Sequence, residues 1–314
     1  MNTLGIIIII AMAAEFILNL IVNILNLMNQ SKPISKELTD IFDDTEYNKS
    51  QQYTRHKTYL ELVTGTFMLL ITWAFWLSGG FNYLDLFARE VTVQPILLGL
   101  IYSLILLIAS TLISLPFSIF STFVTEQKFG FNKTNVKTFV IDQIKSLLLT
   151  IILFGLLLSI VLVIFEYINY AWLVCWAAIT AFTISITFIA PAWIMPLFNK
   201  FTPLEKNELR TKIEDYASQV NFKFKNIFVI DGSKRSSHSN AFFTGFGSTK
   251  RIALFDTLVE EHSENEILAI LGHEIGHYKL KHIHMSTFMG IISTGIIFFI
   301  LSIVIELNTL YEAF

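Results

Sequence analysis

Residues 271–290 read LGHEIGHYKLKHIHMSTFMG, and the residues that follow them to position 305 are almost all apolar. The stretch itself carries four histidines and one glutamate, Glu274. A polar helix able to carry chemistry therefore runs directly into a segment long enough to enter a membrane, and the fold must accommodate both.

Composition places most of the chain in a membrane. Of its 314 residues, 54% are hydrophobic and 15% are charged, whereas a soluble domain carries about 25% charged residues. A helix that spans a bilayer needs roughly 20 apolar residues. The segments that reach this length are 4–28, 60–80, 95–124, 145–165, 170–198 and 285–306. We therefore predict a mainly α-helical, polytopic membrane protein with six transmembrane helices. The net charge of −3 gives no indication of a nucleic-acid partner.

Lysine and arginine predict how these helices are oriented. From the N-terminus, the segments outside the predicted helices carry 0, 5, 1, 4, 0, 12 and 0 of them. Positive charge collects on the cytoplasmic side of a membrane. The three basic segments, 29–59, 125–145 and 199–284, are therefore expected on the cytoplasmic side, with the N-terminus and residue 314 on the opposite side.

The first predicted helix is unusual in its polar residues. No Lys or Arg precedes Lys32, so the basic start of a signal peptide is missing and the helix is expected to be retained. Glu15, Asn19, Asn23 and Asn26 recur at steps of three or four and share one face. That face either hydrogen-bonds to neighbouring helices or lines a hydrated chamber, and the sequence leaves both open.

The predicted domains are a transmembrane bundle over 1–198 with loops 29–59 and 125–144, a soluble domain over 199–284, a sixth transmembrane helix over 285–306 and an end segment 307–314. In the soluble domain we expect a polar helix (203–220) and then strands in KNIFVIDGS (225–233), HSNAFFTGF (238–246) and KRIALFDTLV (250–259). A helix capped by Ser263 and Glu266 is expected to continue through His284.

The helix after Ser263 carries a metal motif. His273 and His277 lie one helical turn apart, so their imidazoles can converge on one ion. Glu274 lies beside the first histidine and can reach a water at the metal rather than the metal itself. This is the arrangement of H-E-x-x-H metallopeptidases, in which the glutamate is the general base. The sequence therefore predicts a zinc site with Glu274 as the catalytic residue.

Sequence spacing supplies no third ligand, although a catalytic zinc needs three. In enzymes with H-E-x-x-H-x-x-G-x-x-H the third ligand is a histidine, but the last two of those positions here hold Leu280 and Ile283. His282 and His284 are expected at the membrane interface. Upstream, no spacing favours any one of Asp256, Glu260, Glu261 and Glu264. Downstream only Glu306 and Glu312 remain, and the charge count places both at or near the opposite face of the membrane, about a membrane thickness from His277. The sequence is therefore either incomplete at its C-terminus or that of a protein which has lost its site.

Several stretches together resemble a known family. They are HEIGHYKLKH (273–282), RSSHSNAFFTGFGSTKRIALFDTLV (235–259), EYNKSQQYTRHKTYLELV (46–63), EQKFGFNKTN (126–135) and APAWIMPLFNKFTPLE (190–205). In this order and spacing they are similar to the integral-membrane CAAX prenyl endopeptidases of the Ste24 type, which are M48 zinc metallopeptidases. The resemblance covers nearly the whole chain.

The resemblance implies a helical barrel of seven spans around a hydrated chamber, with the seventh helix beyond residue 314. It implies a zincin-like domain with a small β-sheet on the cytoplasmic side and one zinc ion per chain. The third ligand would be a glutamate beyond Phe314. Asn240, Ala241 and Phe242 map onto the family's substrate-docking strand, which pairs with an extended peptide, although ordinary packing also explains them. Arg235 and His238 could assist there by charge.

Three functions fit these residues. The first is an endopeptidase that cleaves C-terminally prenylated peptides, with membrane lipid as its surroundings. The second is an M48 membrane quality-control protease with broad peptide specificity. The third is a non-catalytic membrane scaffold with an incomplete metal site. The membrane is either a bacterial inner membrane or the endoplasmic reticulum.

Overall fold

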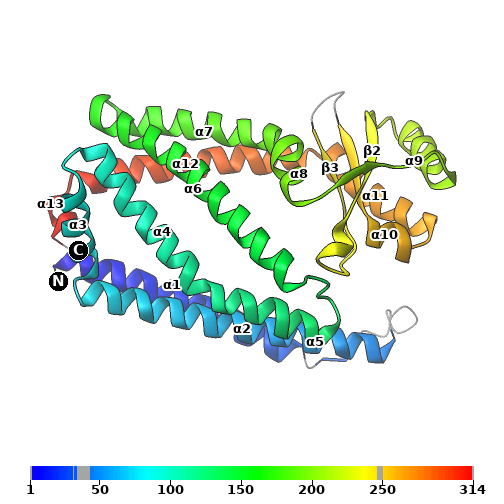
Figure 1. Ribbon diagram of the computed structural model, residues 1–314, viewed down its shortest axis with the longest axis horizontal. Helices are drawn as coiled ribbons and strands as arrows, with labels where there is room; N and C mark the ends of the chain where they lie inside the picture. Colours follow the sequence, from blue (N-terminus) through cyan, green and yellow to red (C-terminus); the bar gives the residue numbers. More distant parts are fainter. Residues whose placement is uncertain (1, 31, 34–42, 246–249, 313–314) are drawn as a thin grey trace. The chain divides into compact units, whose positions relative to one another are not determined.

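The structure, a computed structural model, describes residues 2–30, 32–33, 43–245 and 250–312 (Figure 1). In this part of the chain, six helical stretches are long and apolar enough to cross a membrane. They are α1 (Thr3–Asn29), α2 (Asp44–Leu77), α4 (Pro95–Phe120) extended to Phe129, α6 (Val136–Tyr167), α7 (Ala171–Ile189) extended to Phe198, and α12 (His282–Ile305). The six predicted transmembrane helices are confirmed, and the chain is a multi-pass integral membrane protein.

Two of these stretches contain π-helical turns where the backbone passes a proline. In the third, α4 contains Pro116 and is followed by η1 (Ser121–Glu126) and α5 (Gln127–Phe129). In the fifth, η2 (Ala190–Ile194) and α8 (Met195–Phe198) follow α7, and Pro191 lies in the first turn of η2. Proline removes one hydrogen bond of the helix, so the neighbouring turns must adjust.

Helix boundaries differ from the prediction where polar residues join an apolar helix. α2 begins at Asp44, so the later part of the loop 29–59 is helical, as expected for the residues after Pro33, and residues 34–42 of that loop lie outside the described residues. Segment 81–94, expected as a connection, forms α3 (Gly80–Val91). The short α13 (Asn308–Tyr311) follows α12. Gly130, with a left-handed φ of +86°, ends α5, and Asn135 then caps α6 by accepting a hydrogen bond from the Thr138 N–H.

Contacts divide the chain into two compact units, Met1–Gly130 with Leu301–Phe314, and Phe131–Ile300. The second unit contains the sheet and the H-E-x-x-H helix. The domain boundaries expected at residues 198, 284 and 306 stay a prediction.

The sheet of the second unit has four strands in the order β1-β2-β4-β3. These are β1 (Phe201–Pro203), β2 (Asn226–Ile230), β4 (Arg251–Phe255) and β3 (Ala241–Thr244). β2 and β4 are parallel, whereas β1 pairs with β2 and β3 pairs with β4 in antiparallel fashion. The three predicted strands are confirmed, and β1 was missed because it has only three residues. β3 lies at the edge of this sheet.

One face of the sheet forms the core of this unit. Alternate strand residues, Ile227, Ala241, Ile252 and Leu254, point to that face. They pack with buried residues of α9 (Glu208–Gln219), α10 (Asp256–Glu261) and α11 (Glu264–Lys279). The predicted cap of α11 is confirmed: Ser263 and Glu266 form a reciprocal capping box. Hydrogen bonds from the Ser263 side chain and backbone lower the pKa of the Glu266 carboxyl, so this cap is complete at neutral pH and weakens as the pH falls through that lowered pKa.

The segment that leads into β3 is fixed by Arg235. Its guanidinium bonds both carboxylate oxygens of Asp142 on α6, at 2.7 and 3.0 Å, and the carbonyl of Phe198 at 2.7 Å. The neighbouring residues pair with 131–133 through backbone bonds, from the Lys133 N–H to the Arg235 carbonyl and from the Ser237 N–H to the Phe131 carbonyl. The side chains of Arg235 and Asp142 are only 23% and 20% exposed. This partial burial makes the bidentate pair stronger than an ion pair in open water.

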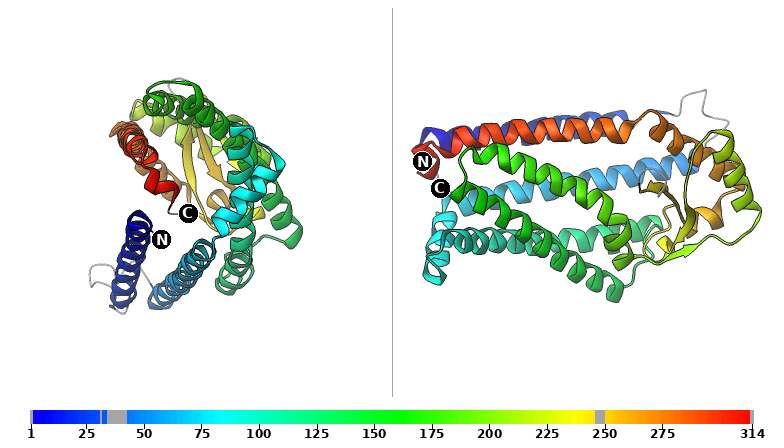
Figure 2. Two further views of the ribbon diagram at one scale, coloured as in Figure 1. Left: turned by 90° about the vertical axis from the view of Figure 1, so that its left-hand side faces the viewer. Right: turned by 90° about the horizontal axis from the view of Figure 1, so that it is seen from above.

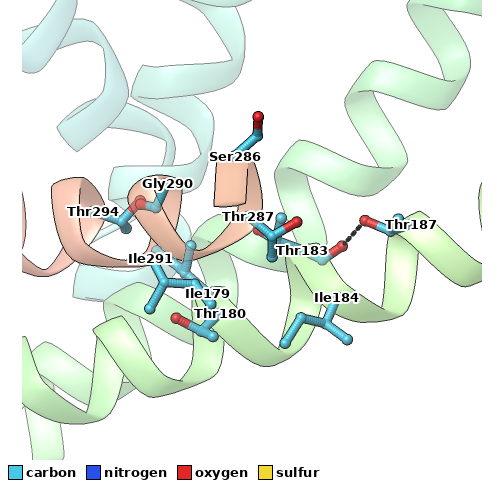
Figure 3. A pocket seen from close by; sticks show the side chains of 10 residues that line it. All are labelled: Ile179, Thr180, Thr183, Ile184, Thr187, Ser286, Thr287, Gly290, Ile291 and Thr294. Carbon is cyan, nitrogen blue, oxygen red and sulfur yellow. Dashed lines mark hydrogen bonds between the residues drawn. The ribbon is translucent and has the colours of Figure 1, made fainter. Parts of the chain in front are cut away.

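Within the same unit, α7 and α12 run side by side (Figure 2). The Trp176 indole on α7 donates a hydrogen bond of 2.8 Å to the carbonyl of Ile291 on α12. A cavity of about 330 Å³ lies between the helices, lined largely by hydroxyl-bearing residues (Figure 3). The hydroxyls of Thr187, Thr287 and Thr294 each donate to a carbonyl of their own helix, at 2.8 Å. The hydroxyls of these three threonines are therefore satisfied within their own helices, whereas the hydroxyl of Thr180 in the same cavity is buried without a hydrogen-bond partner in the part of the chain that the structure describes.

Candidate metal centre

Helix α11 has a buried face and an exposed face. Ile267, Leu271 and Ile275, spaced by four residues, are buried in the core below the sheet. His273 and His277 are also spaced by four residues, lie on the other side of the helix and are exposed. Glu274 is half-buried. The packing of the apolar stripe therefore decides which way the two histidines face.

The two histidines meet at their Nε2 atoms, which lie 2.9 Å apart. Their ring centroids are 4.6 Å apart and the rings are nearly perpendicular, at 81°. Two ligand nitrogens about 2.0–2.1 Å from a tetrahedral zinc lie roughly 3.3 Å apart. A small opening of this pair would admit the ion, so the donor set fits two of the ligands of a zinc site.

A third ligand is not assembled in the described part of the chain, where no three His, Cys, Asp or Glu side chains are grouped so as to hold a metal. Two of the acidic residues considered from the sequence have other partners. The Asp256 carboxylate accepts a hydrogen bond from the Ser233 N–H at 2.8 Å. Glu264 pairs with Lys212 at 2.5 Å. The expected glutamate beyond Phe314 stays a prediction.

Sequence reasoning missed a break in the helix after His277. The predicted continuous helix from Ser263 to His284 is wrong: α11 ends at Lys279, and α12 begins at His282. Between them Lys281 has a left-handed φ of +58°, a conformation that costs an L-residue roughly 1–2 kcal/mol. His282 consequently contacts His277, with the two Nδ1 atoms 2.7 Å apart. No glycine or proline marks this turn in the sequence.

A buried lysine joins the last turn of α11 to the sheet. Lys250, just before β4, is 5% exposed. Its Nζ lies 3.7 Å from the ring centroid of Tyr278 and 4.5 Å from that of Phe222. The Phe222 ring also contacts the ring of Phe243 on β3, with centroids 4.7 Å apart. This aromatic cluster holds the residue after His277 in a fixed relation to the edge strand.

The residues expected to dock substrate lie at the start of β3, against which α11 packs. The Asn240 carbonyl accepts from the Phe255 N–H at 2.9 Å. Antiparallel partners bond at alternate residues, so with the observed register Phe242 bonds to β4, and the polar backbone groups of Ala241 and Phe243 point to the other edge. The Ala241 N–H is already bonded by the side chain of Asn240, at 2.8 Å.

The two residues that the sequence suggested as charged assistants differ in their surroundings. The Arg235 guanidinium is committed to Asp142 and Phe198, as described above. The His238 ring stacks on the ring of Phe131, with centroids 4.3 Å apart. The His238 carbonyl accepts a hydrogen bond from the Thr257 hydroxyl at 3.1 Å. Both residues therefore hold the approach to β3 in place.

The fold and the motif define a polytopic membrane protein in which an H-E-x-x-H helix packs on a small mixed sheet. A family model described as CAAX prenyl protease N-terminal, five membrane helices, matches residues 23–200, and a model of peptidase family M48 matches residues 203–314. The chain belongs to the CAAX prenyl protease family of M48 peptidases. The resemblance seen in the sequence is thereby confirmed.

Individual relatives agree. A probable CAAX prenyl protease 1 from Schizosaccharomyces pombe is 38% identical over 299 residues, covering 88% of this chain and 61% of its own length. CAAX prenyl protease 1 from Saccharomyces cerevisiae is 39% identical over 301 residues, covering 88% of this chain and 64% of its own. The crystal structure of S. mikatae Ste24p matches with a TM-score of 0.90 and 37% identity, over 96% of this chain and 73% of that one. The chain thus spans less than two thirds of the two curated relatives.

The glycines of α11 give a test of how the histidine helix is seated. A Cβ at Gly272 would lie 2.7 Å from the Tyr216 hydroxyl of α9, whereas one at Gly276 would meet nothing within 4 Å. Gly272→Ala must displace the Tyr216 hydroxyl, and this overpacking should cancel or exceed the gain in helix propensity of about 1 kcal/mol, so that the variant is less stable than Gly276→Ala. Gly276→Ala should be neutral or stabilise it by up to about 1 kcal/mol through helix propensity. Thermal unfolding in detergent measures both, and equal shifts for the two variants would contradict this packing of α9 on α11.

Proposed function

We propose that this chain carries the water-activating half of a zinc-dependent endopeptidase site that cleaves prenylated, CAAX-type peptides. One observation carries the proposal: the Nε2 atoms of His273 and His277 converge to 2.9 Å beside Glu274, on a helix that packs against an open-edged strand. The relatives' printed names supply the substrate class, since both are CAAX prenyl proteases.

In this proposal His273 and His277 would hold one zinc ion through Nε2, together with a third ligand. Zinc, when bound, supplies a Lewis acid that polarises the scissile carbonyl and the attacking water. Glu274 takes one proton from that water as the oxygen bonds to the carbonyl carbon. Glu274 then gives the proton to the amide nitrogen as the C–N bond breaks, which releases the amine of the leaving peptide. Its place next to the first ligand and its half-buried side chain suit this transfer.

The edge of β3 is proposed to align the substrate. An extended peptide can add to a sheet edge as a further strand, with main-chain hydrogen bonds giving affinity. The Ala241 carbonyl and the backbone N–H and carbonyl of Phe243 point to that edge, while Asn240 and Phe242 keep β3 paired to β4. The packing of α11 on β3 would then hold the scissile bond close to the histidine pair.

We further propose that the peptidase part faces the cytoplasm. The alternation of basic and non-basic segments supports this, because residues 199–284 carry 12 of the 22 Lys and Arg residues. A prenylated substrate made in the cytoplasm would then reach the site from the side on which it is anchored to the lipid.

The role of Glu274 is tested by Glu274→Gln in the full gene product. We expect hydrolysis of a prenylated peptide to fall by at least a hundredfold, because the proton acceptor is lost, while bound zinc measured by atomic absorption is unchanged. His273→Ala is the matched variant and should lose the zinc as well. Turnover retained in Glu274→Gln would remove this residue from its role, and an unsubstituted protein that binds zinc without hydrolysing peptide would favour a non-catalytic scaffold.

If the substrate adds to β3 as a further strand, every second backbone amide of the substrate should be needed for binding. In a series of peptides with one backbone amide methylated at a time, kcat/KM should fall about tenfold or more at alternate positions and little between them, since each lost hydrogen bond at a desolvated site costs about 1–3 kcal/mol. A loss that follows no alternation would argue against pairing with β3.

Sidedness is tested by cysteine labelling. The one native cysteine, Cys175, is fully buried, so an impermeant maleimide should report engineered positions. Lys137→Cys and Lys206→Cys should label from the cytoplasmic side and Tyr83→Cys from the opposite side. Any other grouping of these three exposed positions contradicts the proposed orientation.

A further inference from the structure

His282 makes a contact that the H-E-x-x-H motif does not account for. Its Nδ1 lies 2.7 Å from Nδ1 of His277, and the two ring centroids are 4.9 Å apart at 65°. His277 presents its other nitrogen, Nε2, to His273. The imidazole of His277 is therefore held from both of its nitrogens, by two other histidines.

The backbone is built to make this contact. On a continuous helix a residue five positions on is rotated by about 140° and would face away from His277. Here Lys281 adopts a φ of +58° between α11 and α12, which breaks the helix, and the first residue of α12 lies against the last turn of α11. A non-glycine residue in the left-handed region is strained, and such strain is retained where a particular geometry is needed.

The chemistry of imidazole gives the contact a direction. A neutral histidine has one N–H and one lone pair, and a metal ligand must offer the lone pair. If His277 binds the ion through Nε2, its proton is on Nδ1, and Nδ1–H donates to the lone pair on Nδ1 of His282. Partners of this kind fix the tautomer and the ring orientation of a ligating histidine, and their loss commonly costs 10–100-fold in metal affinity.

We propose that His282 is a positioning residue that orients His277 for metal binding, rather than a metal ligand itself. The inference rests on the proposed zinc site. The Nδ1 atom of His282 is directed at Nδ1 of His277, on the side of the His277 ring away from His273. The His282 side chain would therefore not reach an ion held between the Nε2 atoms of His273 and His277.

Three substitutions separate this role from a general structural one. His282→Phe keeps a ring of similar size but removes the acceptor. His282→Asn places an acceptor oxygen on Cγ, where Nδ1 is bonded in histidine. His284→Phe is the matched control, because His284 is also exposed and its side chain has no hydrogen bond to His277 within the described residues.

The readout is zinc affinity, measured by chelator competition on the purified full gene product in detergent. We expect His282→Phe to weaken zinc binding 10–100-fold, His282→Asn to recover at least part of this loss, and His284→Phe to bind as the unsubstituted protein does. The visible spectrum of the cobalt-substituted protein should be the same for His282→Asn and the unsubstituted protein, because the number of ligands does not change.

Three results would overturn the inference. Unchanged zinc affinity in His282→Phe would show that the contact does not orient His277, while zinc binding by the unsubstituted protein and its loss in His273→Ala would leave the proposed site intact. A cobalt spectrum altered in both His282 variants would make His282 a ligand. Absence of zinc binding by the unsubstituted protein would instead overturn the proposed function and this inference together.

Discussion

The seating of α11 is the constraint on which the site depends. Its apolar stripe, Ile267, Leu271 and Ile275, is buried against the sheet and α9, so the rotation of the helix about its axis is fixed by packing rather than by the metal. Because this face of the helix is buried, His273 and His277 on the opposite side point away from the core. A metal ion at the proposed site would bind side chains that are already converged, which would lower the conformational entropy lost on binding.

Much of this could be read from the sequence because the signals were local and periodic. The apolar runs were long enough to be recognised as membrane helices, the three longer strands alternated, and Ser263 and Glu266 had the spacing of a capping box. The pairing of His273 with His277 followed from one helical turn. Each of these depends on residues within a few positions of one another, which is why the structure agrees with them.

The features that were missed arise from the surroundings of a residue rather than from its neighbours in the chain. Lys281 takes a left-handed conformation although the turn contains no glycine or asparagine, the residues that usually adopt it. The contact of His282 with His277 therefore could not be predicted from the local sequence. β1 is too short to show alternation and is defined by its pairing with β2. The burial of Lys250 between two aromatic rings depends on Phe222 and Tyr278, each of which is 28 positions away in the chain. A third zinc ligand is likewise a long-range property, since no spacing selected one.

The bond between Arg235 and Asp142 also sets an order of events during synthesis. The two residues are separated by 93 positions, and α6 and α7 are made before Arg235 leaves the ribosome. The Asp142 carboxylate on α6 therefore has no bond to Arg235 until β1, α9 and β2 have been translated. Because the entropy of closing a long loop grows only with the logarithm of its length, the separation of 93 positions adds little more to the free-energy cost of this contact than a shorter loop would. The contact that fixes the approach to β3 can thus form only after α6 and α7 have been made, either before α12 is translated or later.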